Sequence, residues 1–147
     1  MGMKSRMKGK VGEREIAAIV RDLTGWDVKR KVRQLDGEAD LEGIPLFSVE
    51  VKRHATATRA EVAAWWEQAR NQGMAESKIP VLFYRKDRDD WRAVWSAALM
   101  IGGSDWPEYG LTIEGSIEVW AAAARDLANT TREALKECCD VSKQKIA

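Results

Sequence analysis

Within the segment Leu46–Arg53, apolar and polar side chains alternate, which is typical of a β-strand with two different faces. One face carries Phe47, Val49 and Val51. The other carries Ser48, Glu50 and Lys52. The chain must therefore contain a sheet, and a carboxylate and an amine share one face of one of its strands.

Periodicity and turn residues predict the elements around this strand. An i, i+3, i+4, i+7 pattern of apolar residues indicates a helix over 11–23 that ends at Gly25. Thr58 and Glu61 form a capping box that begins a second helix, and Gly73 is a natural end for it. Residues 1–10 are expected to be mobile, and 38–42 should form a hairpin with 46–53 that turns at 43–45. Strands are further predicted at 26–33, 79–84, 91–95 and 111–113, turns at 34–37 and 87–90, and a last helix at 117–139.

Length and composition are those of one globular domain. A chain of 147 residues with 45% apolar content can bury a sizeable core. No segment approaches the roughly 20 apolar residues that a membrane span needs, so we expect a cytoplasmic protein. The adjacent Cys138 and Cys139 cannot easily bridge each other and form no spaced ligand set, which argues against a zinc site.

The net charge of +1 conceals a basic N-terminal region. Residues 1–33 contain ten Lys or Arg and four acids, a net charge of +6. Such clusters suit phosphate backbones, although a solvated surface is the alternative interpretation. The candidate DNA-binding residues are Lys8, Lys10, Lys29, Arg30, Lys31, Arg33, Arg53 and His54.

Three carboxylates and a lysine form a candidate hydrolytic site: Glu13, Asp40, Glu50 and Lys52. Glu13 lies roughly 50° from the centre of its helix's apolar stripe and Glu15 roughly 110°, so Glu13 is better placed to face the protein. Asp40 and Glu50 could converge on one Mg²⁺ ion, with the backbone carbonyl of Val51 as a further ligand. Lys52 could orient or deprotonate an attacking water. The alternative is that Glu50 and Lys52 form a surface pair on a solvated sheet.

Four short motifs follow one another with consistent spacing. They are Lys8–Glu15 (KGKVGERE), Ala39-Asp40-Leu41, Val49–Lys52 (VEVK) and Ile79–Leu82 (IPVL). Over about residues 8–95 this combination resembles the archaeal Holliday junction resolvases and related phage enzymes of the PD-(D/E)xK nuclease superfamily. Ala39 stands where the superfamily often has proline, and residues 31–37 lack the serine of typical archaeal resolvases.

The resemblance implies an α/β restriction-endonuclease-like fold, with a central mixed sheet flanked by helices. The mainly helical C-terminal extension is expected from the sequence pattern, because the last fifty or so residues have no counterpart in the resemblance. We expect one nuclease domain over 1–147, with a core at about 8–95. By the same resemblance, Glu13, Asp40 and Glu50 would ligate Mg²⁺, which Mn²⁺ would replace, and Lys52 would be catalytic. Gln68 resembles a helix glutamine found near the metal in some members, with a surface amide as the alternative.

The expected function is that of a Mg²⁺-dependent, structure-selective DNA endonuclease, a Holliday junction resolvase that acts as a homodimer in recombination. One alternative keeps the chemistry but changes the substrate to duplex DNA, ends or flaps. A second alternative is a DNA-binding module of the same fold without catalysis.

Tryptophans and the C-terminal segment have predicted structural roles. Trp65, Trp66, Trp91 and Trp95 fall at core positions. Trp106 and Trp120 are candidates for a dimer surface or a DNA contact. The small residues 121–124 would let another helix approach closely, and 96–147 as a whole is expected to serve packing or dimerisation.

Overall fold

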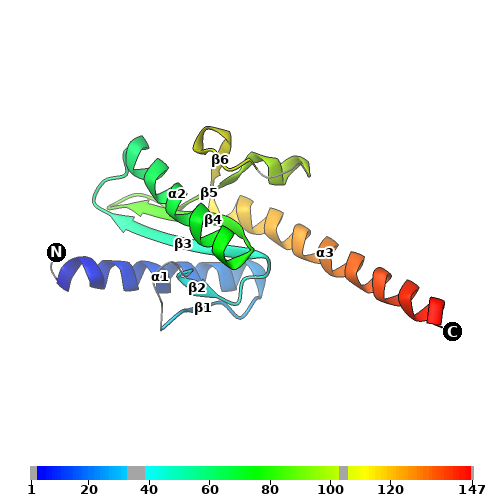
Figure 1. Cartoon of the computed structure of the whole chain (residues 1–147). Coiled ribbons are helices and arrows are strands. Elements are labelled where there is room, and N and C mark those ends of the chain that lie inside the picture. The colour runs from blue at the N-terminus through cyan, green and yellow to red at the C-terminus, as the bar shows by residue number, and fades with distance from the viewer. Residues whose placement is uncertain (1–2, 33–38, 103–105, 147) are drawn as a thin grey trace.

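The computed structural model describes residues 3–32, 39–102 and 106–146. Figure 1 shows the order of the elements along the chain. They are α1 (Met3–Thr24), β1 (Lys29–Arg30), β2 (Leu41–Glu42), β3 (Phe47–His54), α2 (Arg59–Glu76), β4 (Ile79–Lys86), β5 (Arg92–Ser96), the 3₁₀ helices η1 (Ala97–Ile101) and η2 (Tyr109–Leu111), β6 (Thr112–Gly115) and α3 (Ile117–Ile146). In the described part of the chain, no helix combines the length and the apolar character that crossing a membrane would require.

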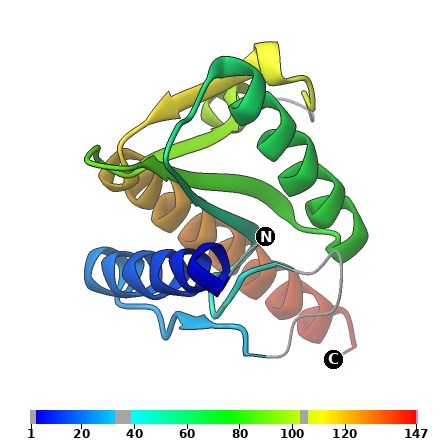
Figure 2. The same cartoon turned by 90° about the vertical axis from the view of Figure 1, so that its left-hand side faces the viewer.

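A four-stranded mixed sheet, in the order β3-β4-β5-β6, forms the centre of the molecule. β3 and β4 are parallel and are joined by α2, which is the usual way to connect parallel neighbours. β4–β5 and β5–β6 are antiparallel. Helix α2 covers one face of the sheet, and α1 and α3 cover the other (Figure 2). The predicted α/β fold with a mixed sheet flanked by helices is confirmed.

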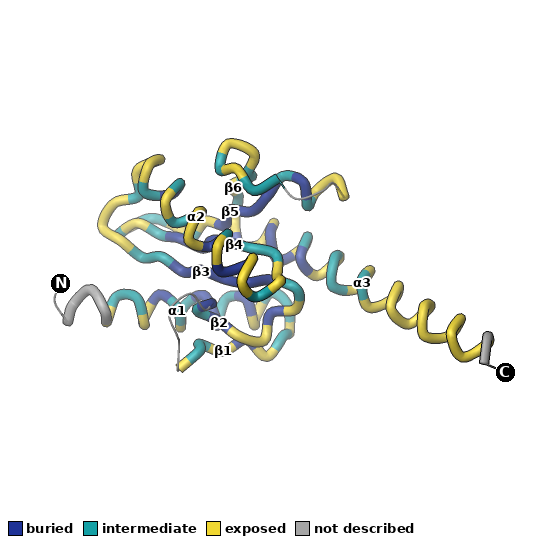
Figure 3. The backbone as a smooth tube through the Cα atoms, in the orientation of Figure 1, coloured by how far each residue is buried: buried dark blue, intermediate teal, exposed yellow. Residues whose placement is uncertain are grey.

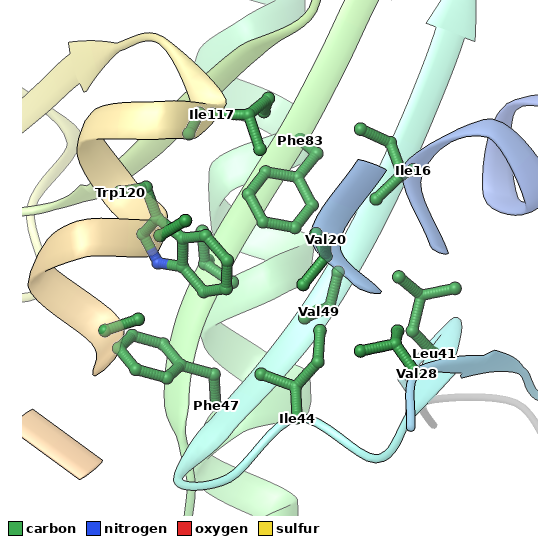
Figure 4. Packing of buried hydrophobic residues seen from close by; sticks show 14 of the residues in the cluster. Ile16, Val20, Val28, Leu41, Ile44, Phe47, Val49, Phe83, Ile117 and Trp120 are labelled. Carbon is green, nitrogen blue, oxygen red and sulfur yellow. The ribbon is translucent and has the colours of Figure 1, made fainter. Parts of the chain in front are cut away.

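The larger core lies between the sheet and the helices α1 and α3. Trp120 of α3 is fully buried there, in edge-to-face contact with Phe47 and Phe83 at centroid distances of 5.3 and 4.8 Å (Figure 4). Ala121 and Ala124 are buried beside it, in the part of α3 that packs against α1. The expectation that Trp120 lies on a dimer or DNA surface is therefore wrong, and the helix that approaches these alanines belongs to the same chain.

β2 does not form the predicted hairpin with β3. It pairs instead with β1, antiparallel, with Arg30 opposite Leu41. Gly43 has φ +88° and lies so close to the Asp27 carbonyl that a Cβ would come within 2.1 Å of that oxygen, so only glycine permits this close approach. The predicted 26–33 strand is reduced to two residues, and the turn at 34–37, with Arg33 and Glu38, falls outside the described residues.

All three helices extend further than their sequence signals predict. α1 begins at Met3, so the expected mobile segment is helical in its described part. The capping box of Thr58 and Glu61 is present, but α2 continues past Gly73 to Glu76 and is capped by Ser77 in the left-handed conformation. Gly73 instead permits close packing, since a Cβ there would meet the Lys78 carbonyl oxygen at 2.8 Å. α3 continues to Ile146, and its second half is exposed to solvent (Figure 3).

Candidate active site

Glu50 lies at the middle of β3 with a side chain that is almost fully buried. One of its carboxylate oxygens, Oε1, is 2.6 Å from the Lys52 ammonium, and the other, Oε2, accepts a hydrogen bond of 2.6 Å from the Gln72 amide. The shared face that strand alternation predicts is therefore present, and the pair is too buried to be a solvated surface ion pair. A buried carboxylate held by one amine and one amide is fixed in orientation.

Asp40 lies beside β3, one residue before β2 begins. Its Oδ2 accepts a hydrogen bond of 2.7 Å from the Val51 N–H, and its own N–H donates to the Val49 carbonyl at 2.9 Å. Burial, followed by the negative charge of Glu50, raises the pKa of Asp40 to about 7. Glu13 raises this pKa further, and the Lys52 ammonium lowers it.

Glu13 lies on α1, which covers the opposite face of the sheet from the contact between Glu50 and Gln72. It contributes to the raised pKa of Asp40 although it forms an ion pair of 2.5 Å with Arg30 Nε. Glu15, by contrast, turns away and binds Arg53 and Arg85 at 3.2 Å each. Glu13, Asp40, Glu50 and Lys52, whose charges act on one another at Asp40, are called the cluster below. Glu15 instead fastens α1 to the ends of β3 and β4.

The glutamine that enters the cluster is Gln72, and the prediction for Gln68 is corrected here. Gln68 is exposed on α2, whereas Gln72, one turn later, is buried and bonded to Glu50. Sequence periodicity contained this signal, because Gln72 follows the buried Ala69 by three residues and so lies on the apolar stripe of the helix.

The candidate DNA-binding residues divide into two groups. Arg30 lies in the cluster through Glu13, and Lys31 donates its N–H to the Asp40 carbonyl at 3.0 Å. The others have contacts of their own or face solvent. Lys8 pairs with Asp87, Lys29 with Asp27 and Arg53 with Glu15. Lys10 is exposed, and the His54 ring stacks on the Trp65 ring with a centroid distance of 4.8 Å. Partial burial and then the Lys52 charge hold the pKa of His54 below its ordinary value.

Among the tryptophans with a predicted role, Trp65, Trp91 and Trp106 are only half-buried.

The cluster does not form a closed ligand set for a divalent cation in this conformation. As the side chains stand, no group of three or more His, Cys, Asp or Glu in the described part of the chain is gathered closely enough to hold an ion. One of the three candidate ligands, Glu13, is occupied by Arg30. Burial and then the negative charge of Glu50 raise the pKa of Asp40, and a bound cation would favour its ionised form. Hard oxygen donors of this kind fit Mg²⁺.

Comparisons with known proteins identify a solved structure and a sequence family to which this chain is similar. The structure of Hjc, a Holliday junction resolvase from the archaeal hyperthermophile Archaeoglobus fulgidus, is similar over 76% of this chain and 86% of that chain, with 15% identity and a TM-score of 0.43. No curated protein sequence matches the chain. A sequence profile described as "Phage putative PDDEXK endonuclease" matches residues 4–101, which include every residue of the cluster. The predicted relationship to the PD-(D/E)xK nucleases is thereby confirmed, and the chain belongs to this family of phage PDDEXK endonucleases.

Proposed function

We propose that this protein is a Mg²⁺-dependent endonuclease that hydrolyses phosphodiester bonds in branched DNA, with four-way junctions as its preferred substrate. One observation carries the proposal: the buried Glu50 contacts the Lys52 ammonium at 2.6 Å, within the field of Asp40 and Glu13. A group of carboxylates with an amine beside them is the equipment that metal-assisted phosphodiester hydrolysis needs.

Each residue has a defined task in this proposal. Asp40 and Glu50 would hold the ion together with Glu13 once Arg30 has released it, and the Val51 carbonyl is a further candidate ligand. When bound, Mg²⁺ or Mn²⁺ would neutralise charge at the scissile phosphate and lower the pKa of a bound water. Lys52 orients the attacking water and balances the negative charge that develops on the phosphate.

Gln72 and Arg30 support this arrangement without forming ligands. The Gln72 amide donates to one oxygen of Glu50 and so fixes the plane of that carboxylate. Arg30 neutralises Glu13 at 2.5 Å, and after exchange for the ion its guanidinium would be free to contact a DNA phosphate.

The choice of branched DNA rests on the motifs that resemble archaeal resolvases, and the homodimer belongs to the same proposal. Two sites related by two-fold symmetry would cut a four-way junction on two strands. Such an enzyme would act in the cytoplasm of a phage-infected or prokaryotic cell, on recombination intermediates.

The experiment compares the wild-type protein with Glu50→Gln and Lys52→Met on labelled four-way junctions, flaps and linear duplexes, in Mg²⁺ or in EDTA. Both variants should lose roughly 10²–10⁴-fold in rate, the range expected for a positioned acid–base group. The matched control is Lys78→Met, because Glu76-Ser77-Lys78 is a second Glu-x-Lys sequence whose lysine is exposed.

The outcomes separate the competing functions. Paired, symmetric nicks in the junction that need Mg²⁺ support the full proposal, and light scattering should then report a dimer. Equal cutting of linear duplex would refute the preference for junctions and leave the nuclease. Binding without cutting on any substrate would indicate a non-catalytic DNA-binding module.

A further inference from the structure

The second half of α3 projects from the body of the molecule (Figures 1 and 3). Most of its basic residues lie on one side of the helix. Four basic residues follow one another at intervals of seven, four and seven positions, which places them on one side of a helix. They are Arg125, Arg132, Lys136 and Lys143, called the α3 basic stripe below. Asp126, Glu133 and Glu137 lie about 90° further round the helix.

The α3 basic stripe is exposed and lacks acidic partners. All four side chains are exposed, and among the described residues no ion pair of theirs with a carboxylate is observed. Arg125 donates to the Leu23 carbonyl at 3.4 Å, where α1 ends, and Arg132 contacts Asn129 at 3.4 Å. Four positive charges therefore face solvent along about 27 Å of helix.

A groove runs along this side of the helix. It has a volume of about 640 Å³ and lies between α3 and the residues Pro45 and Leu46, which directly precede β3. Arg132, Lys136 and Lys143 line it, with Asp140 as the one acid among its lining residues. The lining thus has a net charge of +2, together with apolar side chains such as Leu135.

The groove begins beside the residues that directly precede β3, the strand that carries Glu50. Leu46 precedes Glu50 by four residues, so the near end of the groove lies about 13 Å along β3 from the catalytic carboxylate. From there the α3 basic stripe leads outward. At 3.4 Å for each phosphate of one strand, its length of about 27 Å corresponds to about eight base pairs.

We propose that the α3 basic stripe and its groove bind the phosphate backbone of a duplex arm that extends from the cleavage site. The inference rests on the proposed function for its choice of DNA as the partner. The positive charge of the stripe is complementary to phosphate. The length of the stripe suits a duplex arm that extends beyond the base pairs that the active site itself can contact. The stripe contacts no bases and so adds affinity without sequence preference.

The test measures binding alone, in the inactive Glu50→Gln background, so that a failure to cleave DNA does not affect it. The probes are four-way junctions with arms of about 5 or about 20 base pairs, shorter or longer than the roughly eight that the stripe spans. The variant combines Arg132→Gln, Lys136→Gln and Lys143→Gln. Binding is measured as a function of salt concentration, and circular dichroism checks that α3 remains helical.

The long-armed junction should lose at least tenfold in affinity, and the slope of log K against log salt should fall by up to about 2.7. The short-armed junction should lose much less. A matched variant adds Asp126→Asn, Glu133→Gln and Glu137→Gln, which restores the net charge of the helix. The reduced slope should persist in this variant, because local contacts and not net charge produce it.

An unchanged slope, an equal loss on short and long arms, or recovery on restoring the net charge would overturn the proposal. The proposal would also be overturned if substituting the stripe lowered the molar mass of the protein and left the slope unchanged, because the groove would then hold a second copy of the chain. If the background protein bound no DNA at all, the inference would also be refuted. Binding that depends on the stripe, in a protein that cuts nothing, would refute the proposed function and leave this inference in place.

Discussion

Replacing Asp40 by asparagine should change how the stability of the metal-free protein depends on pH. The pKa of Asp40 is about 7 in the folded chain, against 3.8 for an ordinary aspartic acid, chiefly because of burial and then the Glu50 charge. Between these two values the folded state binds more protons than the unfolded state. The wild-type protein therefore loses stability as the pH rises from about 4 to about 7, and this loss is complete above pH 7.

The size of the effect follows from the same two values. One pKa unit corresponds to about 1.4 kcal/mol, and the window from about pH 5 to the folded pKa covers about two units. The Asp40 contribution to the free energy of unfolding should thus fall by about 2–3 kcal/mol between about pH 5 and pH 8. Asparagine cannot titrate, and its side-chain oxygen can still accept the Val51 N–H.

Urea denaturation in EDTA at several pH values would measure this difference. Subtracting the variant's curve from the wild-type curve cancels groups such as His54, whose lowered pKa acts in the opposite direction. Asp126→Asn, on the exposed side of α3, is the control and should leave the wild-type pH dependence in place. Parallel curves for wild type and Asp40→Asn would show that Asp40 titrates normally, and the electrostatic argument for a cation site would then fail.

Two further substitutions test the positions around the cluster. Gln72→Ala should lower the cleavage rate by roughly 10–100-fold, as is usual for residues that orient a ligand, with little change in substrate affinity. Gln68→Ala, one turn away and exposed, should leave the rate unchanged, and equal effects of the two would contradict the assignment. Gly73→Ala should destabilise the fold by about 1–3 kcal/mol in urea denaturation, because its Cβ would meet the Lys78 carbonyl oxygen at 2.8 Å. Unchanged stability would show that the α2–β4 connection can relax.

Local patterns in the sequence predicted those features that depend on one element at a time. Alternation along β3 placed Glu50 and Lys52 on one face, and the structure joins them at 2.6 Å. Helical periodicity selected Glu13 over Glu15, and Glu13 contributes to the raised pKa of Asp40 whereas Glu15 binds Arg53 and Arg85. Both results follow from fixed side-chain periods, which hold whatever the rest of the chain does.

Features that depend on a distant partner were not predictable in this way. β2 is followed by good turn residues and would suit a hairpin with β3, yet it pairs with β1, and Gly43 packs on the backbone of Asp27. Trp120 shares the apolar stripe of α3 with Ile117, Ala121 and Ala124, but its contacts Phe47 and Phe83 lie far away in the sequence. The extent of α2 was missed because Gly73 is a packing position here and not a helix stop.

The continuation of α2 past Gly73 explains how two separate strands come to present one site. The last turns of this helix carry Gln72 and Glu76, four residues apart and hence on the same side. Gln72 donates to Glu50 of β3, and Glu76 accepts the N–H of Ala39 at 2.8 Å, directly before Asp40. A helix that ended at Gly73 would lack the second contact, and the backbone before Asp40 would lose its connection to α2. Asp40 and Glu50 are thus connected through a third element, α2, which contacts the backbone beside one and the side chain of the other.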